Sequence, residues 1–402
     1  MGDVLFLAHR VPYPPDRGDK IRSFHLLKHI ARHARVHLVA FADDEADCGH
    51  HGALAPFTAT RTIVRRRIGK GRAMLAALAS GKPASLTAFA SRAASEAIAS
   101  ILAGHDIETI FVFSGQMAQY LPEDFAGRIV MDFVDMDSAK FAAYADDAHG
   151  PMRWLLRREA RLLGTFERDV AARADTSLFV SAAEAALFRA SGAAGNILAV
   201  ENGIDTAHFD PAAAFKPVEE TGPLIVFTGQ MDYRPNVDAV DRFARRILPL
   251  VHESIPQARF AIVGRKPDPR VRSLAALPGV LVIGEVPDVR GWLAATAVAV
   301  APLGLARGIQ NKVLEAMAMA RPVVASPAAA EGIDHAGTIR VADGTPAFAA
   351  AVIELIRDPV DAAALGRRAR AQTIERYGWD ARLAALDPLL GFSDRPTTRS
   401  AA

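Results

Sequence analysis

Short apolar runs alternate with helix-like segments along nearly the whole chain, and this alternation restricts the possible folds most strongly. An apolar run that leads through a loop into a helix, and then into another apolar run, is typical of a parallel sheet with helices on its faces. The predicted strands include residues 4–8, 36–41, 109–113, 258–264, 280–284 and 323–325. We therefore predict the α/β fold class, with doubly wound parallel sheets.

The alternation occurs in both halves of the chain. At 402 residues the chain is too long for one ordinary hydrophobic core. Residues 206–222 have no hydrophobic periodicity and are interrupted by prolines, so we interpret them as an interdomain linker. The predicted parts are an N-terminal Rossmann-like domain (1–205), a C-terminal Rossmann-like domain (223–376), a last helix (377–390) and a disordered tail (391–402).

Charge, cysteine content and hydropathy exclude several classes of protein. The formal net charge is only +2, which gives no argument for binding nucleic acid. The single cysteine, Cys48, excludes an intrachain disulfide and fits a reducing compartment. The N-terminus reads as a first strand, and no run approaches the roughly 18 apolar residues of a membrane-spanning helix. We expect a cytoplasmic protein, either free or peripheral at the inner face of the membrane.

Residues 306–326 form the clearest candidate site. They read as a loop, a helix over about 311–320 and a short buried strand. A helix that starts just after a strand and a glycine-bearing loop presents backbone N–H groups and the positive end of its dipole to a ligand. Lys312 and Glu315 lie in the first turns of this helix, at the mouth of that site. Periodicity alone fits an ordinary strand–loop–helix unit equally well.

This segment resembles the donor-binding signature of family 4 glycosyltransferases. Glu315 matches the second glutamate of that signature, and A-M-A-M-A-R-P-V-V-A-S follows it in register. Further motifs in the family's order are V-S-A-A-E-A-A-L-F, V-E-N-G-I-D-T-A-H-F and F-T-G-Q-M-D-Y-R-P-N-V-D-A-V. Two others, H-R-V-P-Y-P-P-D-R-G-D-K-I-R-S-F-H-L-L and F-V-D-M-D-S-A-K-F, resemble a narrower group, the sugar transferases associated with PEP-CTERM/exosortase exopolysaccharide systems.

The resemblance implies a GT-B architecture, in which two Rossmann-like domains face a central cleft. It implies that the C-terminal domain binds a nucleotide-diphosphate sugar as donor and that the N-terminal domain binds a lipid-linked or saccharide acceptor. It further implies that the last helix, from Trp379, crosses back to the N-terminal domain. The implied reaction is metal-independent transfer of a sugar in exopolysaccharide biosynthesis, with retention of configuration and no tightly bound cofactor.

Sugar transfer releases a nucleoside diphosphate, whose negative charge grows as the glycosidic bond breaks and must be met by fixed cations and N–H groups. The candidates for this role are Arg234, Lys312, Asn311 and the backbone N–H groups around Gly229 and Gly308. By the family match, Glu315 accepts hydrogen bonds from the ribose hydroxyls, and we expect the helix N-terminus to keep it ionised. The alternatives are a solvated loop position for Arg234 and a purely structural helix-dipole role for Glu315.

Three positions depart from the family pattern. Arg307 stands where many members have a first glutamate that contacts the transferred sugar. Because arginine cannot accept hydrogen bonds, Arg307 is a candidate for binding phosphate or a carboxylated sugar such as a uronic acid. Gln230 replaces an arginine that usually follows the glycine of the first strand, and the nearby Arg234 is its predicted substitute. Ala320 replaces a glycine.

On the acceptor side, Gly18, Asp19 and Lys20 lie where the first helix is expected to face the cleft. Asp135 is a candidate for orienting or deprotonating the acceptor hydroxyl. The run Asp135-Met136-Asp137 looks like the D-x-D metal motif of another glycosyltransferase class, but that class has a different architecture, and we expect no metal here.

The segment that begins at Arg61 and ends at Arg72 holds six basic residues and no acidic one. It is either a solvated edge strand and helix end, or a patch that rests on anionic lipid head groups, to which each basic residue contributes about 1 kcal/mol. No histidine cluster has catalytic spacing, and we expect His9, His25 and His29 to be loop or helix-face residues.

Two other functions remain open. One is a nucleotide-sugar epimerase or hydrolase on the same two-domain fold, which would consume the sugar nucleotide without an acceptor. The other is a non-catalytic partner of an export complex, which would bind the sugar nucleotide and never turn it over. A shared fold does not distinguish these functions, because function depends on the site.

Overall fold

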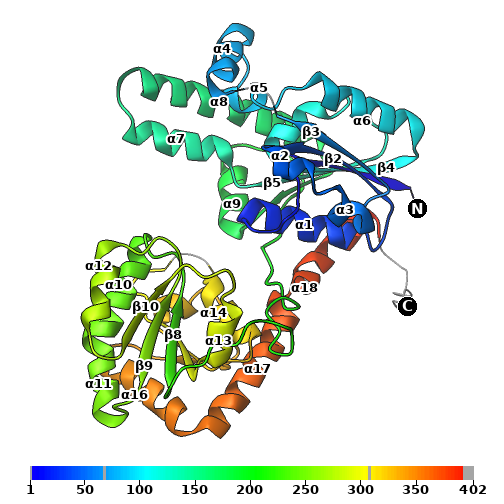
Figure 1. Cartoon of the computed structure of the whole chain (residues 1–402). Coiled ribbons are helices and arrows are strands. Elements are labelled where there is room, and N and C mark those ends of the chain that lie inside the picture. Colours follow the sequence, from blue (N-terminus) through cyan, green and yellow to red (C-terminus); the bar gives the residue numbers. More distant parts are fainter. Residues whose placement is uncertain (1, 67–68, 307–308, 393–402) are drawn as a thin grey trace. The chain divides into compact units, whose positions relative to one another are not determined.

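The computed structural model describes residues 2–66, 69–306 and 309–392. The chain forms two compact units, each built on a parallel sheet of its own (Figure 1). Unit 1 contains the chain up to Asn202 and again from Leu383 onward, and unit 2 contains Gly203–Arg382. The predicted α/β class with parallel sheets is confirmed.

Unit 1 has a seven-stranded sheet with the order β3-β2-β1-β4-β5-β6-β7, and all neighbouring strands are parallel. The strands are β1 (Asp3–Ala8), β2 (Val36–Ala42), β3 (Thr60–Arg65), β4 (Ile107–Phe113), β5 (Arg128–Val134), β6 (Thr176–Phe179) and β7 (Ile197–Ala199). The winding reverses between β1 and β4. Ligands of such sheets bind at the carboxyl ends of the strands beside this reversal.

Helices cover both faces of this sheet, and α7 and α8 form a long antiparallel pair beside it (Figure 1). The helices of unit 1 are α1 (Gly18–Ile30), α2 (Glu45–Cys48), α3 (His51–Leu54), α4 (Lys70–Ser80), α5 (Ala84–Thr87), α6 (Arg92–Gly104), α7 (Asp137–Asp147), α8 (Gly150–Arg173), α9 (Ala182–Ala190) and α19 (Asp387–Leu390).

A buried ion pair attaches α1 to the sheet of unit 1. The guanidinium Nε of Arg22 donates to Asp132 at 2.8 Å, and both side chains are almost completely buried. Arg22 also donates to the carbonyl oxygen of Val200 and to the amide oxygen of Asn202. An ion pair removed from water is stable only with such additional hydrogen bonds. The pair therefore fixes the position of α1, whose first residues are the predicted acceptor-side residues.

Unit 2 has a six-stranded parallel sheet with the order β10-β9-β8-β11-β12-β13. The strands are β8 (Leu224–Thr228), β9 (Arg259–Val263), β10 (Val280–Gly284), β11 (Val298–Ala301), β12 (Val323–Ala325) and β13 (Arg340–Val341). The helices are α10 (Arg234–Arg242), α11 (Leu248–Ser254), α12 (Pro269–Ser273), α13 (Arg290–Ala295), α14 (Asn311–Ala318), α15 (Pro327–Ala330), α16 (Thr345–Arg357), α17 (Pro359–Tyr377) and α18 (Trp379–Leu383).

Helix α14 is held between the sheet and α17. Its predicted apolar face, Val313, Leu314, Met317 and Ala318, is buried in the core of unit 2. Gly366 in α17 allows close packing, because a Cβ atom there would lie 2.1 Å from the carbonyl oxygen of Ala320. This packing fixes the side chains of the first turns of α14 at the carboxyl edge of the sheet.

The segment predicted to be the interdomain linker packs on unit 2. Arg370 donates to the carbonyl oxygen of Phe209 and pairs with Asp210 at 3.0 Å. Arg290 donates to the carbonyl oxygen of His208 at 3.1 Å. The beginning of the segment is therefore held by side chains from unit 2 rather than running free.

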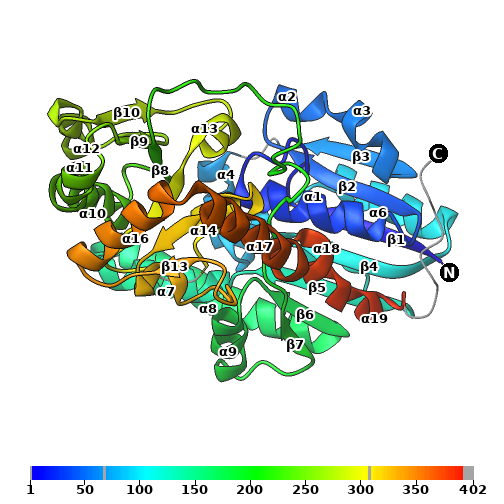
Figure 2. The same cartoon turned by 90° about the horizontal axis from the view of Figure 1, so that it is seen from below.

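The chain returns to unit 1 near its C-terminal end. Figure 2 shows α19 beside α1, and the Nε2 atom of His29 lies 2.8 Å from the Oδ1 atom of Asp387. The predicted disordered tail, 391–402, falls almost entirely outside the described residues. Within the described part of the chain, no helix is both long enough and apolar enough to cross a membrane.

Candidate functional site

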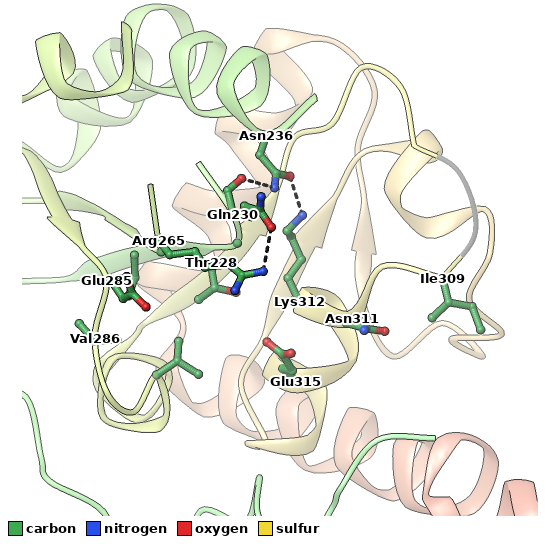
Figure 3. Close-up of a pocket in the computed structure, with 14 residues that line it drawn as sticks. Thr228, Gln230, Asn236, Arg265, Glu285, Val286, Ile309, Asn311, Lys312 and Glu315 are labelled. Carbon is green, nitrogen blue, oxygen red and sulfur yellow. Dashed lines mark hydrogen bonds between the residues drawn. The ribbon is translucent and has the colours of Figure 1, made fainter. Parts of the chain in front are cut away.

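A pocket of about 420 Å³ lies in unit 2, where the carboxyl ends of β8, β9 and β10 meet the N-terminus of α14 (Figure 3). It is next to the reversal of winding between β8 and β11, where sheets of this kind bind ligands. Its lining consists of Thr228, Gly229, Gln230, Asn236, Val263, Gly264, Arg265, Glu285, Val286, Val289, Ile309, Asn311, Lys312 and Glu315. The pocket thus brings together four of the predicted residues: Gly229, Asn311, Lys312 and Glu315.

Two glycines allow backbone to lie close to the pocket. Gly229 follows β8 at a φ of +152°, and a Cβ atom there would lie 2.9 Å from the amide nitrogen of Asn236. Gly264 follows β9, and its Cβ atom would lie 1.6 Å from the carbonyl oxygen of Gly229. Because no larger residue fits at Gly264, the two loops lie against each other, and their backbone can approach a ligand closely.

Lys312 supplies a positive charge to the pocket. Its Nζ atom donates to the Oδ1 atom of Asn236 at 2.8 Å and lies 4.9 Å from the centre of the Phe227 ring. Burial lowers the pKa of Lys312 to about 8, while the charge of Glu315 opposes this shift. The ammonium group is therefore still the main form at neutral pH, and an incoming anion would stabilise it further.

Asn236 fixes the position of this ammonium group. It lies in the first turn of α10, is almost fully buried, and donates from its amide nitrogen to the carbonyl oxygen of Gln230 at 2.8 Å. Its amide oxygen is thereby turned toward Lys312, as Figure 3 shows. The sequence analysis did not find Asn236, because nothing in the local pattern of α10 distinguishes it from a structural polar residue.

Glu315 lies one turn further along α14 than Lys312, and its carboxylate faces the pocket (Figure 3). Burial raises the pKa of Glu315 to about 7, and the charge of Lys312 only partly offsets this. Near neutral pH the carboxyl is therefore partly protonated, whereas the sequence analysis expected it to stay ionised. No described residue donates a hydrogen bond to the Glu315 side chain, so both of its oxygens are available to a ligand.

Arg234 does not line the pocket. Its side chain is 90% exposed and pairs with Asp238, one helical turn away on α10, at 3.7 Å. Arg265, directly after Gly264, lines the pocket instead and donates to the side-chain oxygen of Gln230 at 3.0 Å. The geometry thus favours Arg265 over Arg234 as the second cation, with Gln230 as its partner. The signal that was missed is a basic residue directly after the glycine that ends a strand.

Two predicted donor-side residues, Arg307 and Gly308, lie outside the described residues. Ala320, which replaces a glycine of the family pattern, has a φ of +54°. This is the left-handed conformation that commonly ends a helix and that glycine adopts without strain. The glycine of the family pattern therefore serves to allow this backbone conformation. Alanine adopts the same conformation here, but the strain lowers the stability of the fold.

The acceptor-side residues lie at the start of α1 in unit 1. Gly18 is its first residue, and a Cβ atom there would meet nothing within 4 Å. Asp19 accepts hydrogen bonds from Arg10 at 2.7 Å and Arg17 at 2.8 Å. Burial alone would raise the pKa of its carboxyl, but His9 and Arg10 outweigh burial and hold this pKa well below its usual range. Lys20 is buried and pairs with Asp47 at 2.6 Å, so its charge is already matched.

Asp135 and Asp137 follow β5 at the same edge of the sheet of unit 1. Lys140 lies 3.6 Å from Asp135 and 3.1 Å from Asp137, so an internal cation already bridges the two carboxylates. Asp135 remains partly exposed and within reach of a ligand.

His9 lies in the loop after β1, and His25 and His29 lie on α1, as expected. All three side chains are buried. His9 stacks on Phe113, with 5.7 Å between the ring centres. Burial lowers the pKa of His9 despite the nearby Asp19.

The basic segment that begins at Arg61 includes most of β3, which is the edge strand of the sheet of unit 1. The first of the two interpretations, an edge strand, requires this position. Arg65 pairs with Glu45 and Arg66 pairs with Asp43, both at 2.8 Å. Arg67 lies outside the described residues. These ion pairs neutralise part of the positive charge that the sequence suggested for the segment.

The part of the chain that contains the pocket matches a known family. Residues 222–358 match the family described as Glycosyl transferases group 1, and every residue that lines the pocket lies within this range. No curated protein sequence matches the chain.

The whole chain is similar to several solved structures. Sucrose-phosphate synthase from Thermosynechococcus elongatus has a TM-score of 0.60 and 18% identity, with 97% of this chain and 98% of that chain covered. The Anabaena protein HepE in complex with UDP has a TM-score of 0.60 and 15% identity, with 97% and 100% covered. A glycosyltransferase from Rickettsia africae has a TM-score of 0.60 and 12% identity, with 97% and 98% covered.

At such identities the likeness shows the fold, and the chain therefore has the GT-B fold predicted for it. The family match over residues 222–358 agrees with this fold. The narrower resemblance, to family 4 and to the transferases of PEP-CTERM/exosortase systems, stays a prediction.

Proposed function

We propose that the protein is a glycosyltransferase that moves a sugar from a nucleoside-diphosphate sugar to an acceptor hydroxyl. One observation carries the proposal: the pocket of unit 2 combines the Lys312 ammonium, the Arg265 guanidinium, closely packed glycine loops and the unbonded carboxylate of Glu315. The family match over the same residues supports it, as do the structures of HepE in complex with UDP and with UDP-glucose.

The charges of the pocket suit the two ends of a nucleoside diphosphate. Lys312 and Arg265 would bind the diphosphate together with N–H groups at the start of α14, which is where anions bind on helices. Glu315 would accept hydrogen bonds from the two ribose hydroxyls. These cations are fixed before the reaction, so they stabilise the charge that develops on the leaving diphosphate.

In the proposed step, the bond between the sugar's anomeric carbon and the diphosphate oxygen breaks, and its electron pair stays on the diphosphate. The acceptor oxygen forms the new bond to the same carbon and loses its proton to a base, for which Asp135 in unit 1 is the candidate. We further propose that transfer occurs with retention of configuration, and that Lys312 and Arg265 supply the charge that a metal ion supplies in other transferases.

The proposal also includes an acceptor and the place where it is met. The motifs at the starts of α1 and α7 favour a lipid-linked or saccharide acceptor in exopolysaccharide biosynthesis. A cytoplasmic enzyme that works on such an acceptor would reach it at the inner face of the membrane. The basic segment around β3 is the candidate contact with anionic lipid.

The proposal is tested in two stages with the purified chain. A thermal-shift screen against nucleoside diphosphates and their sugars identifies the donor, because a ligand at about 100 times its dissociation constant adds roughly 2.7 kcal/mol of stability. The donor is then incubated with and without membrane lipids and oligosaccharides, and the products are separated by mass spectrometry.

We expect release of the diphosphate that depends on an acceptor, and loss of this activity in Glu315→Ala. Consumption of the donor without any acceptor would instead indicate a hydrolase or epimerase. Binding without turnover would indicate a non-catalytic sugar-nucleotide-binding protein, and the absence of any binding would contradict the assignment of the pocket.

A further inference from the structure

Three potential metal ligands meet where the C-terminal end of the chain packs on unit 1. His29 and His33 are four residues apart, at the end of α1 and just beyond it, and Asp387 is the first residue of α19. One ligand atom from each lies within 4.8 Å of the others. The Oδ1 atom of Asp387 is 2.8 Å from Nε2 of His29 and 4.0 Å from Nε2 of His33.

We propose that His29, His33 and Asp387 form a binding site for a divalent transition metal such as Zn²⁺, which joins α19 to α1. Two imidazoles and one carboxylate are a ligand set that Zn²⁺ commonly takes, with a fourth position left to water. The site lies in unit 1, and the proposal is independent of the pocket in unit 2 and of sugar transfer.

The distances suit a tetrahedral ion. Ligand atoms that are each about 2.0–2.1 Å from a tetrahedral Zn²⁺ lie about 3.3 Å from one another. The two distances from Asp387 are slightly shorter and slightly longer than this value. The remaining separation, between the ligand atoms of His29 and His33, is at most 4.8 Å, so side-chain rotation would have to bring the three atoms closer together around an ion.

The three side chains are also oriented and accessible. The His33 ring stacks on Phe392, with 5.1 Å between ring centres and 19° between planes, and lies 5.3 Å from the His29 ring. His33 is 25% exposed and Asp387 is 32% exposed, so an ion can enter from solvent, whereas His29 is buried.

A second group in the same unit provides a comparison. Asp3, His37 and His105 also have ligand atoms within 4.8 Å of one another. There, however, His37 has no exposed side-chain surface, and both of its ring nitrogens lie within hydrogen-bond distance of protein atoms, Thr60 and Asp3. The His37 and His105 rings are only 4.0 Å apart, centre to centre. The central ligand of this group, His37, is therefore already occupied by protein atoms and closed to solvent.

The position of the proposed site gives it a role in the fold. The chain leaves unit 1 after Asn202, passes through unit 2, and returns from Leu383 onward. In this returning segment, Asp387 contacts His29 and Phe392 contacts His33. A metal ion at the site would tie the returning segment to α1 with bonds that are stronger than the present hydrogen bond.

The test uses the full chain without a polyhistidine tag, freed of metal with a chelator and then titrated with Co²⁺. We expect one Co²⁺ per chain with visible absorption typical of a site with histidine ligands, and its displacement by Zn²⁺. His33→Ala and Asp387→Ala should each lower the affinity for Zn²⁺ by about tenfold or more, because each removes one ligand. His105→Ala, in the second group, is the matched control and should leave the affinity unchanged.

A second measurement follows the proteolysis of the returning segment rather than the binding of the metal. Zn²⁺ should slow proteolysis of the returning segment in the natural chain, and this protection should be absent in His33→Ala. No binding of Co²⁺ or Zn²⁺ at micromolar concentrations would overturn the proposal. Unchanged affinity in His33→Ala and Asp387→Ala, or loss of binding in His105→Ala, would overturn it as well.

Discussion

The ammonium nitrogen of Lys312 lies 2.8 Å from the amide oxygen of Asn236, and the amide nitrogen of the same asparagine binds the Gln230 carbonyl oxygen. One buried amide therefore holds both the cation on α14 and the loop after β8. These two elements come from separate parts of the chain. By binding both, Asn236 fixes the position of the Lys312 ammonium group relative to the loop that lines the pocket.

Replacing Asn236 with alanine tests this positioning role. The ammonium group would lose a hydrogen bond that favours its charged form, so the pKa of Lys312 should fall below its present value of about 8. We expect nucleoside-diphosphate affinity to drop by about tenfold, as for loss of a hydrogen bond to a charged group. The loss of affinity with rising pH should also begin at a lower pH than in the natural chain, as measured by titration calorimetry. A uniform loss at all pH values would indicate a structural role only.

Arg265 should matter for the diphosphate although its side chain is exposed. Arg265→Met removes a cation that lines the pocket, and we expect affinity for a nucleoside diphosphate to fall by about tenfold. The decrease of affinity with salt should also become less steep, because one charge contact is lost. Arg270→Met is the matched control, since Arg270 is also exposed but pairs with Asp238 outside the pocket. If both changes had equal effects on affinity, Arg265 would not be a residue that binds the diphosphate.

Glu315 should make folding stability depend on pH. Its pKa is raised from 4.5 to about 7 in the folded chain, so the folded state binds the proton more tightly than the unfolded state does. Its contribution to stability is present below about pH 4.5 and is lost as the pH rises through 7.

Glu315→Gln should therefore leave stability nearly unchanged at pH 5 and raise it by an amount on the order of 2 kcal/mol at pH 8. Urea unfolding of both chains at the two pH values measures this difference. The same variant should lose donor binding, so function and stability would change in opposite directions. An equal difference in stability at both pH values would show that the pKa of Glu315 is not raised.

Ala320 should be a site where glycine stabilises the fold. The residue has a φ of +54°, which is strained for alanine and free of strain for glycine. We expect Ala320→Gly to raise the free energy of unfolding by roughly 0.5–1 kcal/mol, despite the greater freedom of glycine in the unfolded chain. Ala316→Gly, inside α14, is the control and should lower it by about 1 kcal/mol. Destabilisation by both changes would contradict the backbone role inferred for position 320.

Much of the fold could be predicted, because buried parallel strands are continuous apolar runs with glycine or proline at their ends. The strands expected at 4–8 and 323–325 appear as β1 and β12, and the helix expected at about 311–320 appears as α14. The pocket of unit 2 was also predicted in outline, since part of it is formed by a strand, a loop and a helix that are contiguous in sequence.

The details of the site depend on contacts that are distant in sequence. Arg234 was expected to replace the missing arginine because it is close to Gln230 in the chain, but α10 turns its side chain toward Asp238. Arg265 reaches Gln230 from the neighbouring strand, 35 residues further along. The charge of Lys20 is matched by Asp47 in the same way. Hydrophobic periodicity reports which face of an element is buried, and it does not identify the partner of a polar side chain.

The central claim is that the pocket of unit 2 binds a nucleoside diphosphate through Lys312. The most direct measurement is calorimetric titration of UDP, with GDP in parallel, into the natural chain, Lys312→Met and Arg234→Met at pH 7.5. We predict that Lys312→Met weakens binding of the preferred diphosphate by roughly 10²-fold, while Arg234→Met, which alters an exposed side chain outside the pocket, leaves it unchanged. Binding that survives in Lys312→Met but is lost in Arg234→Met would contradict the claim.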